Sequence, residues 1–259
     1  MAAKTADSRW FIRTVPNPRA RLRLFCLPYA GGGASVFRSW SNVLPDYLEV
    51  CAVQLPGREN RVREQPFWHI SGVIDILTEL IRPYLNLPFA IFGHSVGAIL
   101  AFELARQIRK VYRLTPTHLF VSAHIAPHLS SPEALHRLPD ASFIEELRMY
   151  GGIPEVLLKE EELMRLLLPS IRADFAINET YVYSDGEPLE CPISAFGGLH
   201  DPKVSSDYLT PWREHTCGPF SQHILPGNHF FLQSSKELLL KTIVDDLTRA
   251  LGRMDAVTG

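Results

Sequence analysis

The chain has 259 residues, of which 46% are hydrophobic and 21% charged, and its formal net charge at pH 7 is −2. This length suits one large α/β domain, which we expect to span residues 1–259, and the small net charge gives no electrostatic reason to expect nucleic acid as a partner. The N-terminal residues lack the apolar segment of a secretory signal and no run approaches the length of a membrane span, so we expect a cytoplasmic protein with no membrane partner.

Strand-like and helix-like patterns alternate along the chain from Arg21 onward. The strand-like segments are apolar runs typical of strands buried on both sides, and they cover residues 22–27, 48–55, 89–92, 118–122, 192–196 and 221–225. The helix-like patterns cover residues 36–44, 71–84, 96–110 and 234–251. This alternation predicts an α/β fold with a mostly parallel central sheet flanked by helices.

Residues 123–190 are too long for a single crossover and contain no convincing strand. Amphipathic stretches around residues 143–150 and 156–167, and a candidate third stretch at 171–183, indicate helices, with a break or hinge at 151–154. We predict that this insertion is a helical lid over the carboxyl edge of the sheet, enclosing an apolar tunnel. The alternative is that these helices pack on the sheet away from any site.

The sequence Gly-His-Ser-Val-Gly at residues 93–97 joins the strand-like segment 89–92 to a helical pattern. In the nucleophile elbow of α/β-hydrolases, a serine lies on a strained strand-to-helix turn, where a Cβ on either flanking glycine would collide with the backbone. Gly93 and Gly97 are placed for that turn. The motif alone is short enough to arise by chance, but its flanking patterns favour an α/β-hydrolase fold with Ser95 as the nucleophile.

A serine nucleophile needs a general base, and the base needs a carboxylate that fixes its tautomer. In α/β-hydrolases these residues follow the serine in the order acid, then histidine. Asp201 comes just after the strand-like segment 192–196 and is the predicted acid, with Asp207 in reserve. His229 lies on the last strand-to-helix loop and is the predicted base.

The oxyanion that forms during acyl transfer needs two N–H donors. We expect one from the residue after the nucleophile, Val96, and the other from the glycine-rich segment 28–34, with Ala30 as the donor. That segment lacks both the G-x-G-x-x-G spacing and a Walker lysine, which argues against a nucleotide cofactor.

The remaining histidines and the cysteines suggest no further chemistry. His94 fills the variable slot of the elbow, and His215 is expected at the surface. The four cysteines have no metal-binding spacing and are interpreted as buried thiols, namely Cys26, Cys51, Cys191 and Cys217. We therefore expect neither a metal nor a cofactor.

Five segments together carry a resemblance to a known family. They are the sequence LPYAGGG at 27–33 with Phe37 and Trp40, QLPGRENR at 54–61, GHSVGA at 93–98, residues 198–202, and GNHF at 227–230. In combination they resemble the type II thioesterases, the discrete editing thioesterases that accompany modular polyketide synthases and nonribosomal peptide synthetases. Many relatives have methionine at the position of Val96, but only its backbone amide is required.

The resemblance implies hydrolysis of acyl groups from the phosphopantetheine arm of acyl or peptidyl carrier proteins. Ser95 would attack the thioester, His229 would move the proton, and Asp201 would orient His229. The amides of Ala30 and Val96 would stabilise the oxyanion. Members of this family also carry a mobile helical lid. We expect the protein to act as a monomer.

Two questions stay open at the level of the sequence. Arg58 and Arg61 either meet the phosphate of the arm or an acidic carrier protein, or form structural ion pairs with Glu59 or Glu64. The alternative functions are a medium-chain fatty-acyl thioesterase, a general carboxylester hydrolase, and a binding protein that keeps the fold without catalysis. The last usually lacks the nucleophile, base or acid, and candidates for all three are present here.

Overall fold

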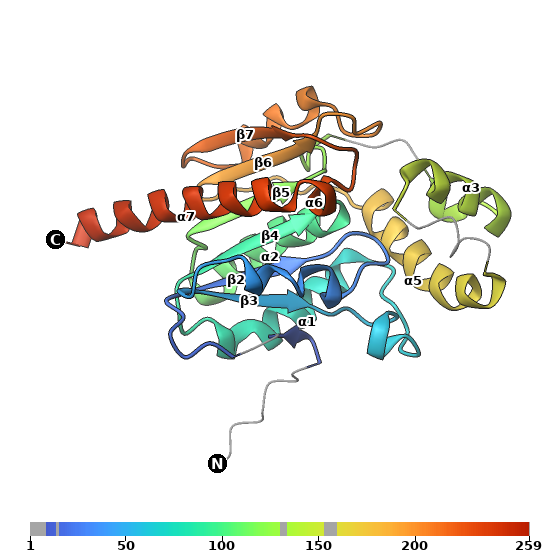
Figure 1. Cartoon of the computed structure of the whole chain (residues 1–259), viewed down its shortest axis with the longest axis horizontal. Coiled ribbons are helices and arrows are strands. Elements are labelled where there is room, and N and C mark those ends of the chain that lie inside the picture. The colour runs from blue at the N-terminus through green and yellow to red at the C-terminus, as the bar shows by residue number, and fades with distance from the viewer. Residues whose placement is uncertain (1–8, 14–15, 130–133, 153–159, 259) are drawn as a thin grey trace, which may run out of the picture.

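A seven-stranded sheet runs through the centre of the molecule (Figure 1). The computed structural model describes residues 9–13, 16–129, 134–152 and 160–258. The strand order is β1-β3-β2-β4-β5-β6-β7, with every neighbouring pair parallel except β1 and β3. The strands are β1 (Phe11–Ile12), β2 (Leu22–Leu27), β3 (Leu48–Val53), β4 (Phe89–His94), β5 (His118–Ser122), β6 (Ile193–Gly198) and β7 (Phe220–Leu225).

The five strands from β2 to β6 are buried along their whole length, as their apolar runs predict. Successive side chains point to opposite faces of the sheet. Thus Phe25 belongs to the core on one face, while its neighbours Leu24 and Cys26 belong to the core on the other. The predicted mostly parallel sheet is confirmed. The prediction missed β1, because a strand of two residues is too short to show an alternating pattern.

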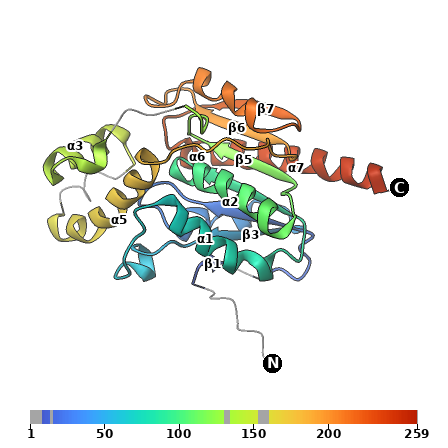
Figure 2. The same cartoon turned by 180° about the vertical axis from the view of Figure 1, so that it is seen from behind.

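Helices cover both faces of the sheet. Figure 2 shows α1 (Ile70–Ile81) and α2 (Val96–Tyr112) lying together on one face, whereas α7 (Lys236–Thr258) crosses the other face in Figure 1. The short helix α6 (Phe231–Ser234) precedes α7. The last pattern, predicted as one helix over 234–251, is therefore broken near its start, and α7 also runs further than predicted. No helix among the described residues is long and apolar enough to cross a membrane.

The prediction of an α-helix over residues 36–44 is wrong. This part of the chain forms two 3-10 turns, Ala34–Phe37 and Trp40–Asn42. Phe37 and Trp40 are fully buried, and their rings meet edge to face with centroids 4.9 Å apart. Their spacing of three residues fits a 3-10 turn as well as an α-helix, so the periodicity of the apolar residues does not distinguish the two.

The insertion between β5 and β6 contains α3 (Asp140–Tyr150) and α5 (Glu161–Glu179), which lie beyond one end of the sheet (Figure 1). The second and third predicted stretches are not separate, because residues 161–179 form one helix. Pro169 lies inside this helix without ending it, since Leu168 and Ile171 beside it are buried in a cluster shared with α3. Residues 153–159, which include half of the proposed hinge at 151–154 and the start of the second predicted stretch, lie outside the described residues.

Three expectations about burial are wrong. The strand β7, predicted to be buried on both sides, is mostly half-buried, with only Leu225 buried, because it is the last strand at one edge of the sheet. The other two concern the segment before β7. His215 is buried rather than exposed, because its ring contacts Trp212 and Phe102 and its Nε2 lies 2.7 Å from Nδ1 of His128. Cys217 is exposed, whereas the other three cysteines are buried as predicted.

Candidate active site

Ser95 lies on the sharp turn between β4 and α2, with φ 55° and ψ −127°. This backbone conformation is strained for a residue with a side chain. A Cβ on Gly93 would lie 2.0 Å from the carbonyl oxygen of Gly97, and a Cβ on Gly97 would lie 2.3 Å from that of Leu27. Only glycine fits either position, so the structure has the elbow that the motif predicts.

The structure brings the three predicted residues into one hydrogen-bonded chain. Nε2 of His229 lies 3.1 Å from Oγ of Ser95, and Nδ1 lies 2.8 Å from Oδ2 of Asp201. The loops after β4, β6 and β7 supply them, because the carboxyl ends of parallel strands meet at one edge of the sheet. The reserve candidate, Asp207, is exposed in the 3-10 turn Ser206–Tyr208.

The acid is held as a carboxylate. Burial by itself would raise the pKa of Asp201, but the hydrogen bond from His229 and those from the amides of Lys203 and Val204 outweigh it and leave the pKa below its usual value. Because a carboxylate only accepts hydrogen bonds, Nδ1 of His229 must donate to it. Nε2 of neutral His229 is then free to accept the proton of the Ser95 hydroxyl, which is the arrangement a general base requires.

His94 holds the backbone of the base, a role that its variable position in the motif did not indicate. It is fully buried, with Nε2 2.9 Å from the carbonyl oxygen of His229 and Nδ1 2.8 Å from Oγ of Ser122. Since a carbonyl oxygen only accepts, Nε2 carries the proton and Nδ1 accepts from the Ser122 hydroxyl. Burial lowers the pKa of His94 to about 3, so this ring is neutral near pH 7.

The two predicted oxyanion donors lie next to the elbow. Val96 is the first residue of α2, where backbone N–H groups have no partner within the helix. Ala30 lies in the loop after β2, and its amide has no backbone acceptor among the described residues. Ala30 and Ser95 line the same cavity. The arrangement suits the stabilisation of negative charge on an acyl oxygen.

Both arginines of the 54–61 segment form structural contacts. Arg58 pairs with Asp174 of α5, with N–O distances of 2.8 and 3.0 Å. Arg61 pairs with Glu64 at 2.6 Å and lies over the ring of Trp10, 4.3 Å from its centroid. Of the two interpretations, the structure supports ion pairs. The partner of Arg58 is not one of the neighbouring glutamates, however, because it lies 116 positions along the chain.

Two cavities meet at the nucleophile, and Ser95, Tyr150 and His229 line both. The larger has a volume of about 390 Å³, and its apolar wall comes mainly from the insertion, with Leu147, Leu167, Ile171 and Phe175. The smaller has a volume of about 220 Å³ and includes polar side chains, those of His124, Asn178, Glu179 and Lys203.

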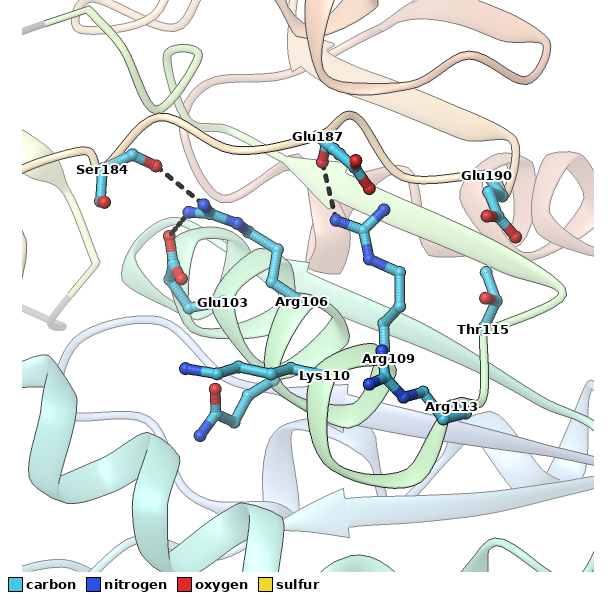
Figure 3. A pocket seen from close by; sticks show the side chains of 10 residues that line it. Glu103, Arg106, Arg109, Lys110, Arg113, Thr115, Ser184, Glu187 and Glu190 are labelled. Carbon is cyan, nitrogen blue, oxygen red and sulfur yellow. Dashed lines mark hydrogen bonds and ion pairs between the residues drawn. The ribbon is translucent and has the colours of Figure 1, made fainter.

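A further hollow of about 640 Å³ lies between the C-terminal half of α2 and residues 184–190, at the opposite end of α2 from Ser95 (Figure 3). Two of its three arginines, Arg106 and Arg109, form contacts that hold the fold together. Arg106 pairs with Glu103 and donates to the carbonyl of Ser184, while Arg109 donates to the carbonyls of Glu187 and Pro188. These bonds fasten the segment that returns from the insertion, and nothing in the hollow resembles the chemistry at Ser95.

The fold and the site together define an α/β-hydrolase with a serine nucleophile. The family model described as "Thioesterase domain" matches residues 22–247, so the chain belongs to the thioesterase family. The chain is therefore an enzyme that hydrolyses thioesters, and the predicted family, fold class and type of reaction are confirmed.

Relatives narrow the class. The chain is 47% identical over 245 residues to the gramicidin S biosynthesis protein GrsT of Aneurinibacillus migulanus. This alignment covers 94% of this chain and 96% of that protein. A solved structure of the type II thioesterase BorB from the borrelidin biosynthetic cluster superimposes with a TM-score of 0.85 at 38% identity, covering 95% of this chain and all of that one. The human medium-chain S-acyl fatty acid synthase thioesterase is 33% identical over 251 residues, covering 93% of this chain and 92% of that protein.

Proposed function

We propose that this thioesterase removes acyl groups from the phosphopantetheine arm of acyl or peptidyl carrier proteins, as a cytoplasmic monomer. The observation that carries the proposal is the hydrogen-bonded chain from Ser95 through His229 to Asp201, together with the two cavities that Ser95 and His229 both line. A carrier-bound thioester has two arms that leave the reacting carbon in different directions. Two cavities that meet at the nucleophile suit such a substrate, and the similarity to biosynthetic type II thioesterases agrees with it.

In the first half of the reaction, Oγ of Ser95 attacks the carbonyl carbon of the thioester while Nε2 of His229 takes the serine proton. The carbonyl oxygen becomes an oxyanion that accepts from the amides of Ala30 and Val96. The tetrahedral intermediate collapses when the C–S bond breaks, and His229 passes its proton to the leaving thiolate. Ser95 is left acylated, and the carrier leaves with a free thiol.

In the second half, a water molecule attacks the acyl carbon while His229 accepts one of its protons. A second oxyanion forms at the same two amides and collapses when the bond to Oγ of Ser95 breaks. His229 returns the proton to that oxygen, and the carboxylic acid leaves. The Asp201 carboxylate stabilises His229 in its cationic form in both halves.

Helices α3 and α5 of the insertion form the lid of this site. The ring of Tyr150 lies over His229, with centroids 5.7 Å apart, and contacts Phe175 of α5. We assign the apolar cavity of about 390 Å³ to the acyl group, because an apolar chain gains from leaving water there. The cavity of about 220 Å³ receives the pantetheine arm, whose amide groups need polar partners such as Asn178.

A medium-chain fatty-acyl thioesterase is the second candidate, favoured by the 33% identity to the human enzyme of that name. The two candidates differ in which acyl length is cleaved fastest. An enzyme that clears short units acts well on acetyl and propionyl groups, whereas a medium-chain enzyme gains with each added methylene.

The test is the mass of a carrier protein loaded with acetyl, propionyl or octanoyl groups, followed after addition of wild-type enzyme or Ser95→Ala. We expect loss of the acyl mass with wild type alone and unchanged circular dichroism for the variant. An oxygen-ester analogue of the loaded arm serves as the matched substrate control. Faster cleavage of simple oxygen esters than of the carrier thioester would contradict the proposal and favour a general esterase.

A further inference from the structure

We propose that Arg58 and Asp174 are positioning residues. Their ion pair fixes both the direction of the Ala30 amide, which is the proposed oxyanion donor, and the position of helix α5 relative to it. The loop at residues 28–34 is named the oxyanion loop here. The inference rests on the proposed function, because it assumes that the Ala30 amide stabilises the oxyanion. It gives a role to the 54–61 segment, which the reaction at Ser95 does not otherwise use.

The ion pair itself is buried and well aligned. Nη1 of Arg58 lies 2.8 Å from Oδ2 of Asp174, and Nη2 lies 3.0 Å from Oδ1, so the two planar groups meet through two parallel hydrogen bonds. Their side chains are only 3% and 2% exposed. Two charges held out of water at this site therefore keep one fixed mutual geometry.

Both members of the pair also bind the backbone of the oxyanion loop, directly after Ala30. Oδ2 of Asp174 accepts from the amide of Gly31 at 2.8 Å. Nη1 of Arg58 donates to the carbonyl of Gly32 at 3.2 Å. The carboxylate thus uses the N–H group next to the proposed oxyanion donor, and the direction of the Ala30 amide depends on where the pair lies.

Close packing adds to these hydrogen bonds. Gly31 has φ 74°, and a Cβ on it would lie 2.7 Å from Cγ1 of Ile171. Ile171 and Asp174 are three residues apart on α5 and so lie on the same side of the helix. Helix α5 therefore packs directly against the oxyanion loop, through an apolar contact of Ile171 and a hydrogen bond of the charged Asp174.

The segment 54–59 fixes the far end of the same loop. Oε1 of Gln54 accepts from the amide of Ala34 at 2.6 Å, and Nε2 of Gln54 donates to the carbonyl of Arg58 at 3.0 Å. Oε1 of Glu59 accepts from the amide of Ser35 at 3.1 Å. The loop is thus held at residues 31, 32 and 34, and the chain is held again at Ser35 just after it, while the Ala30 amide has no backbone acceptor among the described residues.

A role in stability alone does not account for this geometry. A buried ion pair gives little net stability compared with apolar residues of similar volume. Here each partner also directs a hydrogen bond to one short loop of the active site. It follows that a shift of α5, which carries part of the acyl cavity, moves the contact to Gly31 and so changes the stabilisation of the oxyanion.

The consequence for turnover is a loss of kcat with KM nearly unchanged, because the oxyanion forms only during the reaction. Removal of one oxyanion donor costs about 10²–10³-fold in kcat in serine hydrolases. Displacement of such a donor costs less than its removal, and for Asp174→Asn we expect roughly a 10- to 100-fold loss of kcat on that scale.

The experiment compares wild type, Asp174→Asn and the apolar double variant Arg58→Met/Asp174→Leu. The matched control is Glu49→Gln, which disturbs another buried ion pair, that of Arg23 and Glu49, away from the active site. For each we measure kcat and KM on a propionyl-loaded carrier, the thermal midpoint, and the Kd of an alkylboronic acid. A boronic acid that bonds to Ser95 places an oxygen at the oxyanion donors and so reports on them without carrier or turnover.

We expect both variants of the Arg58–Asp174 pair to lose kcat and boronate affinity by similar factors, with less than a threefold change in KM. The double variant leaves no buried charge unpaired, but the amide of Gly31 and the carbonyl of Gly32 lose these partners, so we expect a lower thermal midpoint than that of wild type. An unchanged circular dichroism spectrum at the assay temperature then excludes misfolding as the cause of its low kcat. Glu49→Gln loses thermal stability but keeps kcat and boronate affinity.

The proposal is overturned if the variants of the Arg58–Asp174 pair keep wild-type kcat and boronate affinity, whatever their stability. It is also overturned if kcat falls while boronate affinity does not. If wild type binds the boronate but does not cleave carrier thioesters, the proposed function fails, and the boronate affinities of the variants still decide the role of the pair.

Discussion

Substitution of His94 can separate what the hydrogen bonds of this buried ring contribute to stability from what its volume contributes. His94→Phe keeps a ring of similar size in the elbow but removes both hydrogen bonds, leaving the carbonyl of His229 and the hydroxyl of Ser122 without their partner. A buried polar group that loses its partner costs about 1–3 kcal/mol. We therefore expect His94→Phe to lower the free energy of unfolding by about 2–6 kcal/mol, the sum for two such groups.

His94→Gln is the matched variant. Its amide supplies one of the two hydrogen bonds, the donor to the carbonyl of His229, so about half of that cost is expected. The assay is unfolding in urea followed by circular dichroism, with the midpoint and the slope fitted together, because a changed slope would mean a changed unfolded or native state. Turnover should fall more in His94→Phe than in His94→Gln, since the loop that carries the base is held only in the latter. Equal stability of the two variants, within about 0.5 kcal/mol of wild type, would refute the hydrogen-bond argument.

Three further predictions concern the elbow, acid stability and the acyl cavity. Gly97→Ala should give no folded, active protein, because its Cβ would lie 2.3 Å from the carbonyl oxygen of Leu27. The control Gly252→Ala, with open space around it, should keep wild-type activity and melt at the same or a higher temperature. An active Gly97→Ala would contradict the elbow geometry. Since burial lowers the pKa of His94 to about 3, from the value of about 6.5 usual for histidine, the unfolded chain binds the proton more tightly. Wild type should therefore lose about 2 kcal/mol of stability through this group as the pH falls from 8 to 5. The same loss in His94→Gln, measured by urea unfolding at both pH values, would show that another group is responsible. Leu147→Trp, which narrows the apolar cavity from the side of α3, should lower kcat/KM for octanoyl carriers by more than for acetyl carriers, and equal losses for both lengths would argue against our assignment of the acyl cavity.

The sequence was sufficient wherever a structural feature depends on neighbouring residues. The apolar runs predict the buried strands, and the glycines around Ser95 predict its turn because each lies where the backbone passes within about two ångströms of a Cβ. The positions of Asp201 and His229 follow from the order of strands and loops. Each of them comes just after a strand, and the carboxyl ends of parallel strands meet at one edge.

Features that depend on distant residues could not be predicted in this way. The partner of Arg58 lies 116 positions away, in a helix whose orientation the pattern does not give. His94 shows no sign of its contact with His229, because its partner is a backbone carbonyl 135 positions later. Residues 161–179 form one helix where two stretches are predicted. Proline usually breaks a helix, and the burial of Leu168 and Ile171 explains why this helix continues through Pro169.

In the proposed reaction, Ser95 carries the acyl group between the two halves. The most direct test of this role is rapid quenching of the enzyme with a propionyl-loaded carrier, followed by proteolysis and mass analysis of the peptide that contains Ser95. We expect a propionyl group on Ser95 in wild type at early times and none on the Ser95→Ala variant, which leaves the carrier loaded. Loss of the propionyl group from the carrier in the presence of Ser95→Ala, or acylation of a different residue in wild type, would show that Ser95 is not the nucleophile.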